Sequence, residues 1–467
     1  MSDDTNQADT SPLDSLLGVP DGDAAHDWLR SRNIQDIECI VPDLAGVARG
    51  KMMPTEKFFS GPVMTMPASI FAQTISGEYP EDDDRFQHNP TDGDLYFRPD
   101  YATLTSVPWE SDPTAQLIHD AYTREGEPVE TAPRNFLKRI LKLYEDKGWE
   151  PVVAPELEFY LVKPNTDPDY PLEPPVGRSG RPEVGRQSYS ISALNEFDEL
   201  IDDIYDLSES QGLEIDTMIH EEGAAQMEIN LRHGDPLKLA DQVFLFKRTI
   251  REAALRHEMY ATFMSKPMSG QPGSAMHIHQ SVMDKVTGAN IFSDSNGEET
   301  DDFLSFIAGH QAYLPYVTCI MAPFVNSYRR FARGSTSPVN VFWGYDNRTV
   351  GLRVPYSAPQ ARRLENRIPG SDANPYLAIA ASLACGYLGL TKGLTPDAPQ
   401  SGYSSDIVKS LPRSLPEALR LFENNEDIIE IFGERFVATY RAIKYEEFET
   451  FMSVISPWER EYLLLNV

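Results

Sequence analysis

The spacing of apolar residues divides the chain near residue 131. Between residues 26 and 112, short apolar runs such as 37–41 and 95–97 are broken by turn-forming residues, which predicts a small mixed β unit with one early helix. The first residues carry few large apolar side chains and are typical of a mobile tail. We therefore expect three segments, a tail (1–23), an N-terminal domain (24–130) and a larger C-terminal domain (131–467).

Helix-like and strand-like patterns are mixed within the larger segment. Leu137, Ile140, Leu141 and Tyr144 recur at helical spacing, so a helix is expected there. Further helices are expected over residues 191–211, 237–257, 303–322 and 415–461. Strands are expected over residues 154–161 and 215–231. This mixture predicts the α+β class.

Composition narrows the functional classes. The 467 residues carry a net charge of −31, which disfavours nucleic acid and anionic membrane as partners. No stretch approaches the ~18 apolar residues of a membrane helix, and the first residues lack the pattern of a signal peptide, so a cytoplasmic location is expected. Only 13 of the 41 basic residues are lysine, a bias that resembles salt-adapted proteins. Acidic runs are therefore weak evidence for a site by themselves.

Glu156 and Glu158 are the first candidates for chemistry. They lie two residues apart in a strand-forming run, so they project from one face about 7 Å apart. Two carboxylates at that spacing could hold a divalent cation. The alternative is a half-buried strand whose acidic face meets water.

A second acidic pair, Glu221 and Glu228, follows downstream. Glu228 falls in a strand pattern and Glu221 in the turn before it, so both could face the same ion. An exposed acidic turn is the competing interpretation.

His277 and His279 form a His-x-His strand pattern that points both imidazoles to one face. Small residues at 273–275 would let a ligand approach the backbone. A single histidine on an apolar strand is usually a core residue, but two on one face favour ligand binding.

Arginines gather late in the chain, at Arg348, Arg353, Arg363 and Arg367. Arginine binds phosphate and carboxylate through two parallel hydrogen bonds, and Glu365 alternates onto the same face as its two arginine neighbours. Carboxylates with one or two histidines favour Mg²⁺ or Mn²⁺ over zinc. Together these groups indicate phosphoryl transfer, while a solvated charge stripe is the alternative.

Four segments resemble motifs of the glutamine synthetase family, in the order that the family has them: residues 156–161, 273–279, 326–330 and 361–367. The resemblance extends from about residue 26 to the end. It implies a small β-grasp domain and a larger catalytic domain with a curved antiparallel sheet and flanking helices. It also implies a hexameric ring or a dodecamer of this chain, with active sites shared between neighbours.

The resemblance implies two metal sites. Glu158, Glu221 and Glu228 would hold the metal nearer the substrates, with Glu222 as a substitute for Glu221 if the loop shifts by one residue. The other metal would grip the nucleotide phosphates through Glu156, His277 and Glu365.

Substrate contacts are implied in the same way. ATP would be contacted by His279, Ser281, Arg353 and Arg363, and glutamate by Gly273, Arg330 and Arg367. The catalytic residues would be Arg330, Arg348 and Asp43, the last reaching the amine site of the adjacent subunit.

Two departures from the family's sequence pattern bear on which amine is the substrate. The family's loop glutamate is replaced by Thr336, and residues 69–77 replace a small-domain motif, so both changes favour an amine bulkier than ammonium. Phe71 or Tyr79 could supply an aromatic wall near the acidic loop 78–84, although a salt-adapted surface loop is the alternative.

The amino-acid sequence of segments such as residues 343–350 is most similar to the γ-glutamylpolyamine branch of the family. That branch implies an ATP-dependent ligase that forms a γ-glutamyl amide from glutamate and putrescine or a related amine. The alternatives within this class are glutamine synthetase using ammonia and a γ-glutamyl monoamide synthetase. Outside it stand a catalytically inactive structural relative and a guanidino kinase.

Overall fold

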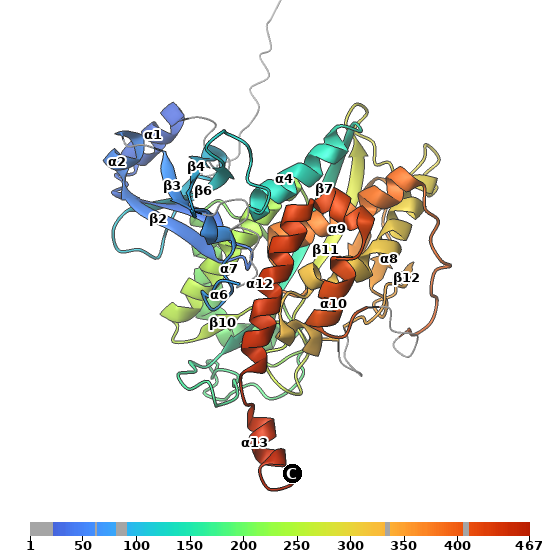
Figure 1. Cartoon of the computed structure of the whole chain (residues 1–467). Coiled ribbons are helices and arrows are strands. Elements are labelled where there is room, and N and C mark those ends of the chain that lie inside the picture. The colour runs from blue at the N-terminus through green and yellow to red at the C-terminus, as the bar shows by residue number, and fades with distance from the viewer. Residues whose placement is uncertain (1–21, 61–62, 81–90, 332–336, 405–410) are drawn as a thin grey trace, which may run out of the picture.

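The structure is a computed structural model, and it describes residues 22–60, 63–80, 91–331, 337–404 and 411–467. Two sheets organise the chain (Figure 1). This is the expected α+β class.

The N-terminal sheet has six strands in the order β2-β1-β6-β4-β3, with β5 paired to β6. β1 and β6 run parallel, and the other pairs are antiparallel. The strands are β1 Asp36–Pro42, β2 Ala48–Pro54, β3 Met64–Pro67, β4 Asp94–Pro99, β5 Thr105–Ser106 and β6 Thr114–Tyr122. The helices beside them are α1 Gly22–Ser31, α2 Thr55–Ser60, η1 Ala68–Phe71 and η2 Tyr101–Thr103. A compact apolar cluster that includes Trp28, Phe71 and Phe97 fills this unit.

The larger sheet has eight strands in the order β12-β13-β14-β11-β7-β9-β8, with β10 paired to β7. Its central strands β9, β7, β11, β14 and β13 are antiparallel neighbours. The strands are β7 Trp149–Val162, β8 Ile215–His220, β9 Gln226–Leu231, β10 Tyr260–Thr262, β11 Met276–Asp284, β12 Trp343–Tyr345, β13 Leu352–Val354 and β14 Leu364–Asn366. The long strand β7 therefore carries both opening glutamates at the centre of the sheet.

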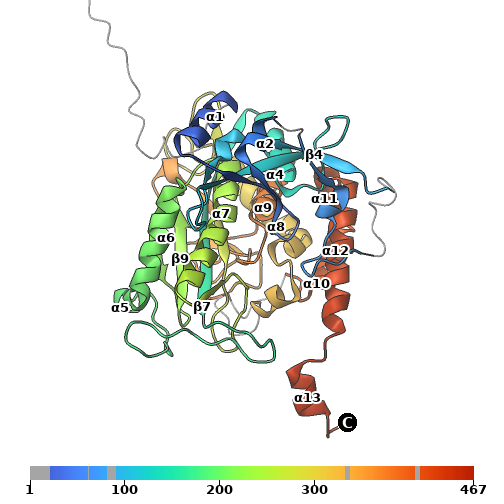
Figure 2. The ribbon, with the colours of Figure 1, turned by 90° about the vertical axis from the view of Figure 1, so that its left-hand side faces the viewer.

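Helices cover one side of this sheet, as Figure 2 shows for α4, α7, α8 and α9. The main helices are α4 Pro133–Glu145, α6 Asp198–Ser210, α7 Pro236–Arg256, α8 Asp301–Met321, α9 Pro375–Lys392 and α12 Glu434–Met452. Shorter ones are α5 Ile191–Leu194, α10 Leu415–Phe422, α11 Glu426–Phe432, α13 Pro457–Leu463 and the 3₁₀ turns η3 Asn195–Phe197, η4 Val325–Arg329 and η5 Pro359–Ala361. None of the helices among the described residues is long and apolar enough to cross a membrane.

The helix predictions are confirmed for α4, α7, α8 and the C-terminal helices. The predicted helix over residues 191–211 is instead broken into α5, η3 and α6. The sequence reasoning missed α9, because nearly every residue of this helix is buried and no polar face marks its period. The three predicted segments stay a prediction, and most of the tail lies outside the described residues.

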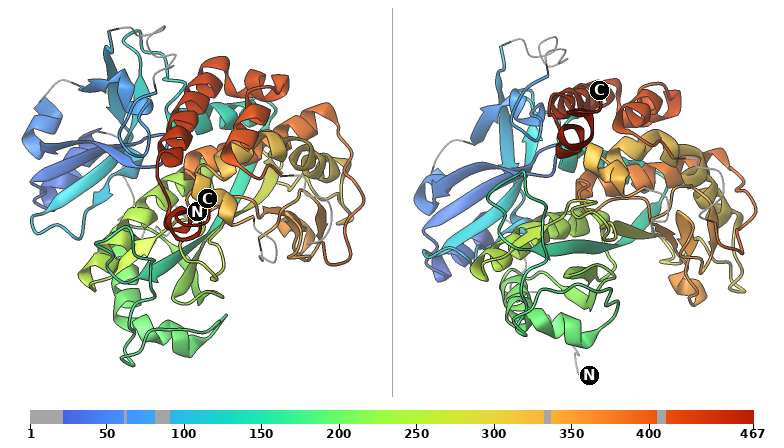
Figure 3. Two further views of the ribbon diagram at one scale, coloured as in Figure 1. Left: turned by 60° about the horizontal axis from the view of Figure 1, so that its bottom comes forward. Right: turned by 90° about the horizontal axis from the view of Figure 1, so that it is seen from below.

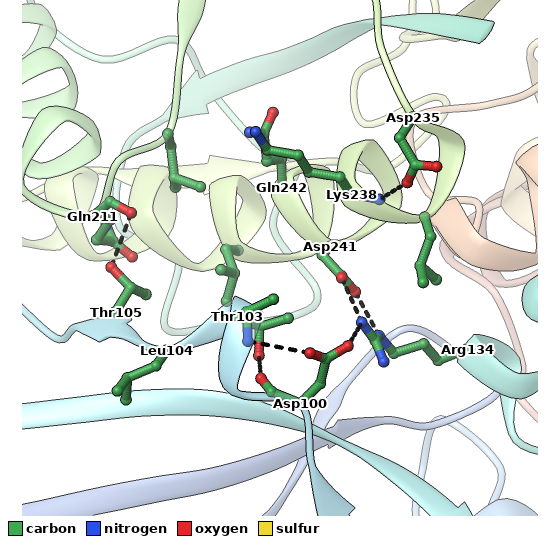
Figure 4. A pocket seen from close by; sticks show the side chains of 14 residues that line it. Asp100, Thr103, Leu104, Thr105, Arg134, Gln211, Asp235, Lys238, Asp241 and Gln242 are labelled. Atoms are coloured by element: carbon green, nitrogen blue, oxygen red, sulfur yellow. Dashed lines mark hydrogen bonds and ion pairs between the residues drawn. The ribbon is translucent and has the colours of Figure 1, made fainter. Parts of the chain in front are cut away.

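The seam between the two units is held by Arg134 on α4. Its guanidinium donates to both carboxylate oxygens of Asp241 at 2.9 Å, to Asp120 at 2.6 Å and to Asp100 at 2.7 Å. Asp100 and Asp120 belong to the N-terminal unit, whereas Asp241 lies on α7 (Figure 4). Tyr376 of α9 donates a further hydrogen bond of 2.6 Å to Asp241. Figure 3 shows the N-terminal sheet (blue) standing beside the larger unit.

Replacing this guanidinium should destabilise the fold strongly. Arg134→Met would leave three aspartates without their buried counter-charge, so the free energy of unfolding should fall by about 3–5 kcal/mol. Urea denaturation at pH 7 measures the change, and Arg30→Met, at an exposed position of α1, is the matched control. A loss no greater than that of the control would show that the seam does not depend on this cluster.

Candidate active site

Strand register brings the predicted residues together on one face of the larger sheet. Glu158 on β7 lies directly opposite Glu228 on β9, and Glu156 lies opposite His277 on β11. One step further along, His279 lies opposite Glu365 on β14, and Glu365 lies opposite Arg353 on β13. Directly paired residues share a face. We call this set, Glu228, Glu158, Glu156, His277, His279 and Glu365, the carboxylate–histidine row.

The row contains two groups of ligand atoms close enough to hold a cation. One group is Glu156, His277 and Glu365, and the other is Glu158, Glu228 and His277. Within each group the ligand atoms lie within 4.8 Å of one another. His277 is common to both groups, so it lies at the junction of two candidate metal positions.

Burial and mutual repulsion raise the pKa of the carboxyl groups in the second group. Glu158 and Glu228 are 7% and 6% exposed. Desolvation, followed by the charge of Glu221, raises the pKa of Glu158 to about 8. Desolvation and the charge of Glu158 raise the pKa of Glu228 to about 10. A divalent cation would relieve this repulsion, so the donor set fits a metal.

The first group has the opposite electrostatic character. Although burial opposes ionisation, hydrogen bonds from His277 and His279 lower the pKa of Glu156. The charge of Arg367 likewise overcomes burial and lowers the pKa of Glu365 to about 2. Burial lowers the pKa of His277 to about 4, which keeps its imidazole neutral and able to bind a metal.

Arginines surround Glu365 at the far end of the row. Arg353 donates to one oxygen of Glu365 at 2.7 Å, and Arg367 donates to the other. Arg363 reaches His279, with 3.2 Å between its Nε and the imidazole Nδ1. Arg348 is exposed, and no ion pair joins it to another described residue.

Glu221 and Glu222 separate in the structure. Glu221 follows the end of β8, and burial, ahead of the charges around it, raises its pKa. Glu222 instead forms an ion pair of 2.6 Å with Arg186. Of the two, Glu221 therefore acts electrostatically on the row.

Gly273 lies where no larger residue fits. A Cβ atom there would come within 2.6 Å of Arg330 and 2.8 Å of a backbone oxygen of Ser265. Arg330 is 2% exposed and donates to the backbone oxygens of Ile368 at 2.6 Å and Arg367 at 2.8 Å. Its guanidinium thus ties η4 to the segment that follows β14. Ser281 extends the row along β11, two residues beyond His279.

Gln226 is a site residue that the sequence reasoning missed. Its side-chain nitrogen lies 3.2 Å from Glu158 Oε2 and 3.1 Å from the backbone oxygen of Gly273. Its side-chain oxygen accepts from Gly223 N at 2.9 Å. Gln226 thereby connects the candidate metal ligand Glu158 to Gly273. Its position two residues before Glu228, on the same strand face, was the available signal.

Two predicted amine-site residues are enclosed within their own chain. Asp43 is 1% exposed and accepts hydrogen bonds from Ala45 N, Val47 N and Arg49 Nε at 2.8–2.9 Å. Its carboxylate is therefore hydrogen-bonded within its own chain, and its role at the amine site of the adjacent subunit stays a prediction. Phe71 is 2% exposed and packs 6.2 Å from Phe97 between ring centroids, so it is a core residue rather than an open wall.

Tyr79 is 41% exposed, and its hydroxyl accepts a hydrogen bond of 2.7 Å from Gln73. It is the one predicted aromatic group that reaches the surface. Thr336 and the acidic stretch 81–84 lie outside the described residues.

Comparisons with known proteins agree with this geometry. The family described as glutamine synthetase, catalytic domain, matches residues 130–463. The γ-glutamylputrescine synthetase of Escherichia coli is 35% identical, over 94% of this chain and 93% of its own. A glutamate–isopropylamine ligase of a Pseudomonas species is 33% identical, over 93% and 95% of the two chains. The solved structure of ligand-free GmaS superposes with a TM-score of 0.79 at 27% identity, over 94% of this chain and 99% of that one.

The chain belongs to the glutamine synthetase family. Members of this family use ATP and divalent metal ions. The carboxylate–histidine row supplies the oxygen and nitrogen donors that such ions require.

Metal binding by the row should release protons. Glu158 and Glu228 carry protons near pH 7 because their pKa values are about 8 and about 10. Binding of Mn²⁺ to the full chain at pH 7 should therefore release about one to two protons, and its affinity should increase toward pH 8.5. Calorimetry in two buffers of different ionisation enthalpy measures the release.

The same shifts fix how the metal-free stability depends on pH. Both pKa values lie above the ordinary 4.5, so the metal-free fold should lose stability as the pH rises from about 5 to 9.

The shared histidine can be tested separately. His277→Gln removes the ligand that both groups of the carboxylate–histidine row share, so it should weaken Mn²⁺ binding by at least ~10-fold. His233→Gln, at an exposed histidine, is the control. Binding without proton release would contradict these protonation states.

Proposed function

We propose that the chain is an ATP-dependent ligase that joins the γ-carboxylate of glutamate to an amine through γ-glutamyl phosphate, with putrescine or a related polyamine as the preferred amine. The observation that carries this proposal is the carboxylate–histidine row with arginines at one end of it. Similarity to two ligases of glutamate with organic amines, over more than nine-tenths of the chain, supports the choice of amine.

The arrangement suits activation of a carboxylate. A γ-carboxylate is a poor electrophile, and it also repels the phosphates of ATP. Cations at the row would neutralise oxygens from one side, while guanidinium groups neutralise them from the other. Phosphorylation then converts the carboxylate oxygen into a leaving group, which a deprotonated amine can displace.

We assign the residues of this chain accordingly. Glu156, His277 and Glu365 hold the cation beside the nucleotide phosphates, and Glu158, Glu221 and Glu228 hold the one beside the substrate. Mg²⁺ is the expected ion, and Mn²⁺ is the substitute. ATP is contacted by His279, Ser281, Arg353 and Arg363, and Arg348 is free to reach the transferred phosphoryl group. Gly273, Arg330 and Arg367 hold glutamate.

The choice of amine can be measured directly. With ATP, glutamate and Mg²⁺, phosphate release should be at least about tenfold faster in kcat/KM with putrescine than with ammonium, because a pocket shaped for a long amine gains contacts that ammonium cannot make. Isopropylamine, spermidine and monoamines complete the panel, and mass spectrometry identifies the γ-glutamyl amide.

Glu158→Gln, which keeps the side-chain shape and removes the charge, gives the background rate. Equal rates with ammonium and putrescine would identify a glutamine synthetase instead. Fastest turnover with a monoamine would identify a γ-glutamyl monoamide synthetase. No release above the Glu158→Gln background with any amine would identify an inactive relative.

We further propose that the chain assembles with itself into a hexameric ring or a dodecamer. Helix α13 supports this, because it projects from the body of the chain (Figure 1) and none of its residues is buried. Trp458 is 62% exposed, and Leu465, just beyond the helix, is 91% exposed. If a second chain covers these apolar side chains, their removal from water stabilises the assembly.

Sedimentation of the full chain should therefore show six or twelve subunits, and Trp458→Asp should shift the distribution toward smaller species. Glu461→Gln, on the same helix, is the control. A monomer at micromolar concentration would contradict the assembly.

A further inference from the structure

A cavity of about 340 Å³ lies on the seam between the N-terminal unit and the larger unit. None of its lining residues belongs to the carboxylate–histidine row. One wall comes from η2 and β5, and the other from α4, α7 and the turn between α6 and β8 (Figure 4). Its volume lies within the range of about 300–1,000 Å³ that is typical of small-molecule sites. We call it the seam cavity.

The apolar part of the seam cavity comes from four leucines, Leu104, Leu213, Leu237 and Leu245. Three of them are almost fully buried, and Leu237 is partly exposed. Branched aliphatic walls of this kind match a branched apolar ligand body.

Most charged groups that line the cavity are already paired. Arg134 is bound to Asp100, Asp120 and Asp241. Asp235 caps α7, because its carboxylate accepts from the backbone nitrogen of Lys238 at 2.8 Å. These groups therefore have their charge or hydrogen bonds satisfied within the chain.

Lys238 and Gln242 are the exceptions. They lie one helical turn apart on α7, so their side chains run along the same face (Figure 4). Among the described residues no carboxylate pairs with the Lys238 ammonium. Gln242 is only 8% exposed, and its side-chain amide has no hydrogen bond to any described residue. Its amide atoms are not among the described buried atoms that lack a partner, so they face the open space of the cavity, where a ligand can reach them.

We propose that the seam cavity binds a small monocarboxylate with a branched apolar body. The Lys238 ammonium and the Gln242 amide nitrogen are two donors that can converge on one carboxylate. The four leucines then enclose the apolar part. Asp100 opposes an anion little, because Arg134 neutralises it. Asp235 accepts a hydrogen bond at one oxygen only, so its charge works against the anion and Lys238 must offset it.

Occupation of this cavity would bind the two units together. The ligand would contact η2 of the N-terminal unit and α7 of the larger unit at once. Lys247, further along α7, donates to the backbone oxygens of Ser371 and Ala373 just before α9. Helix α7, which lines the cavity, is therefore hydrogen-bonded to the segment that follows β14, and a ligand in the cavity should stabilise the whole chain.

The test uses the full chain and the probe 4-methylpentanoate, without ATP or metal. Saturable binding with a dissociation constant of roughly 0.1–1 mM is expected for a ligand of this size, measured by calorimetry, together with a rise in the thermal midpoint. Lys238→Met should weaken binding by at least ~10-fold, because a charge-assisted hydrogen bond is lost. Lys57→Met, an exposed lysine on α2, should bind as the unchanged chain does.

A second variant tests the cavity itself. Ala102→Trp places a large ring at an exposed position of the lining and should also abolish binding, while the chain keeps its fold. Three results would overturn the proposal: no saturable binding up to about 10 mM, equal binding of 4-methylpentanamide, or tighter binding of 4-methylpentylamine. None of these depends on the ligase activity, so the two proposals fail separately.

Discussion

Repulsion between buried carboxylates on two adjacent strands is the constraint around which the larger unit is built. Glu158 and Glu228 face each other across the β7–β9 pair, where water cannot screen them. A folded chain can keep such a pair only by protonating it or by adding a cation. The strands that carry the two residues are interior strands of an eight-stranded sheet, with a neighbour on each side, and helices bury the opposite face. The scaffold thus holds the carboxylates together although they repel one another.

The two ends of the row differ in charge, and this difference matters for chemistry. Arginines and histidines keep Glu156 and Glu365 ionised, whereas Glu158 and Glu228 retain protons until a cation arrives. His277 stands between the two groups and is neutral. One face of the sheet can therefore present two ion positions. The carboxylates of the first are ionised before the cation arrives, and those of the second lose their protons only when a cation binds. Such an asymmetry suits a site that must hold nucleotide phosphates and a substrate carboxylate side by side.

Helix α9 connects the features that lie far apart. Its capping residue Asn374 donates to the backbone oxygen of Asp43 at 2.9 Å, and Tyr376 donates to the seam aspartate Asp241. Further along, Ser382 accepts from Asn366 of β14 at 2.8 Å, directly beside Glu365. The N-terminal turn, the seam and the arginine end of the row are thus fastened to one buried helix. Helix α9, which the spacing of apolar residues did not predict, is therefore the element that connects these three regions.

The sequence by itself determined the ingredients of the site. Alternation along a strand placed Glu156 with Glu158 and His277 with His279, and motif order indicated the family. Only the tertiary structure decided which neighbours these residues meet. It turned Glu222 toward Arg186, enclosed Asp43 and Phe71, aimed Gln226 at Glu158, and left Lys238 and Gln242 facing a cavity. The reason is physical: local periodicity fixes the face on which a side chain lies, whereas burial and pairing depend on strand register and packing between segments distant in the chain.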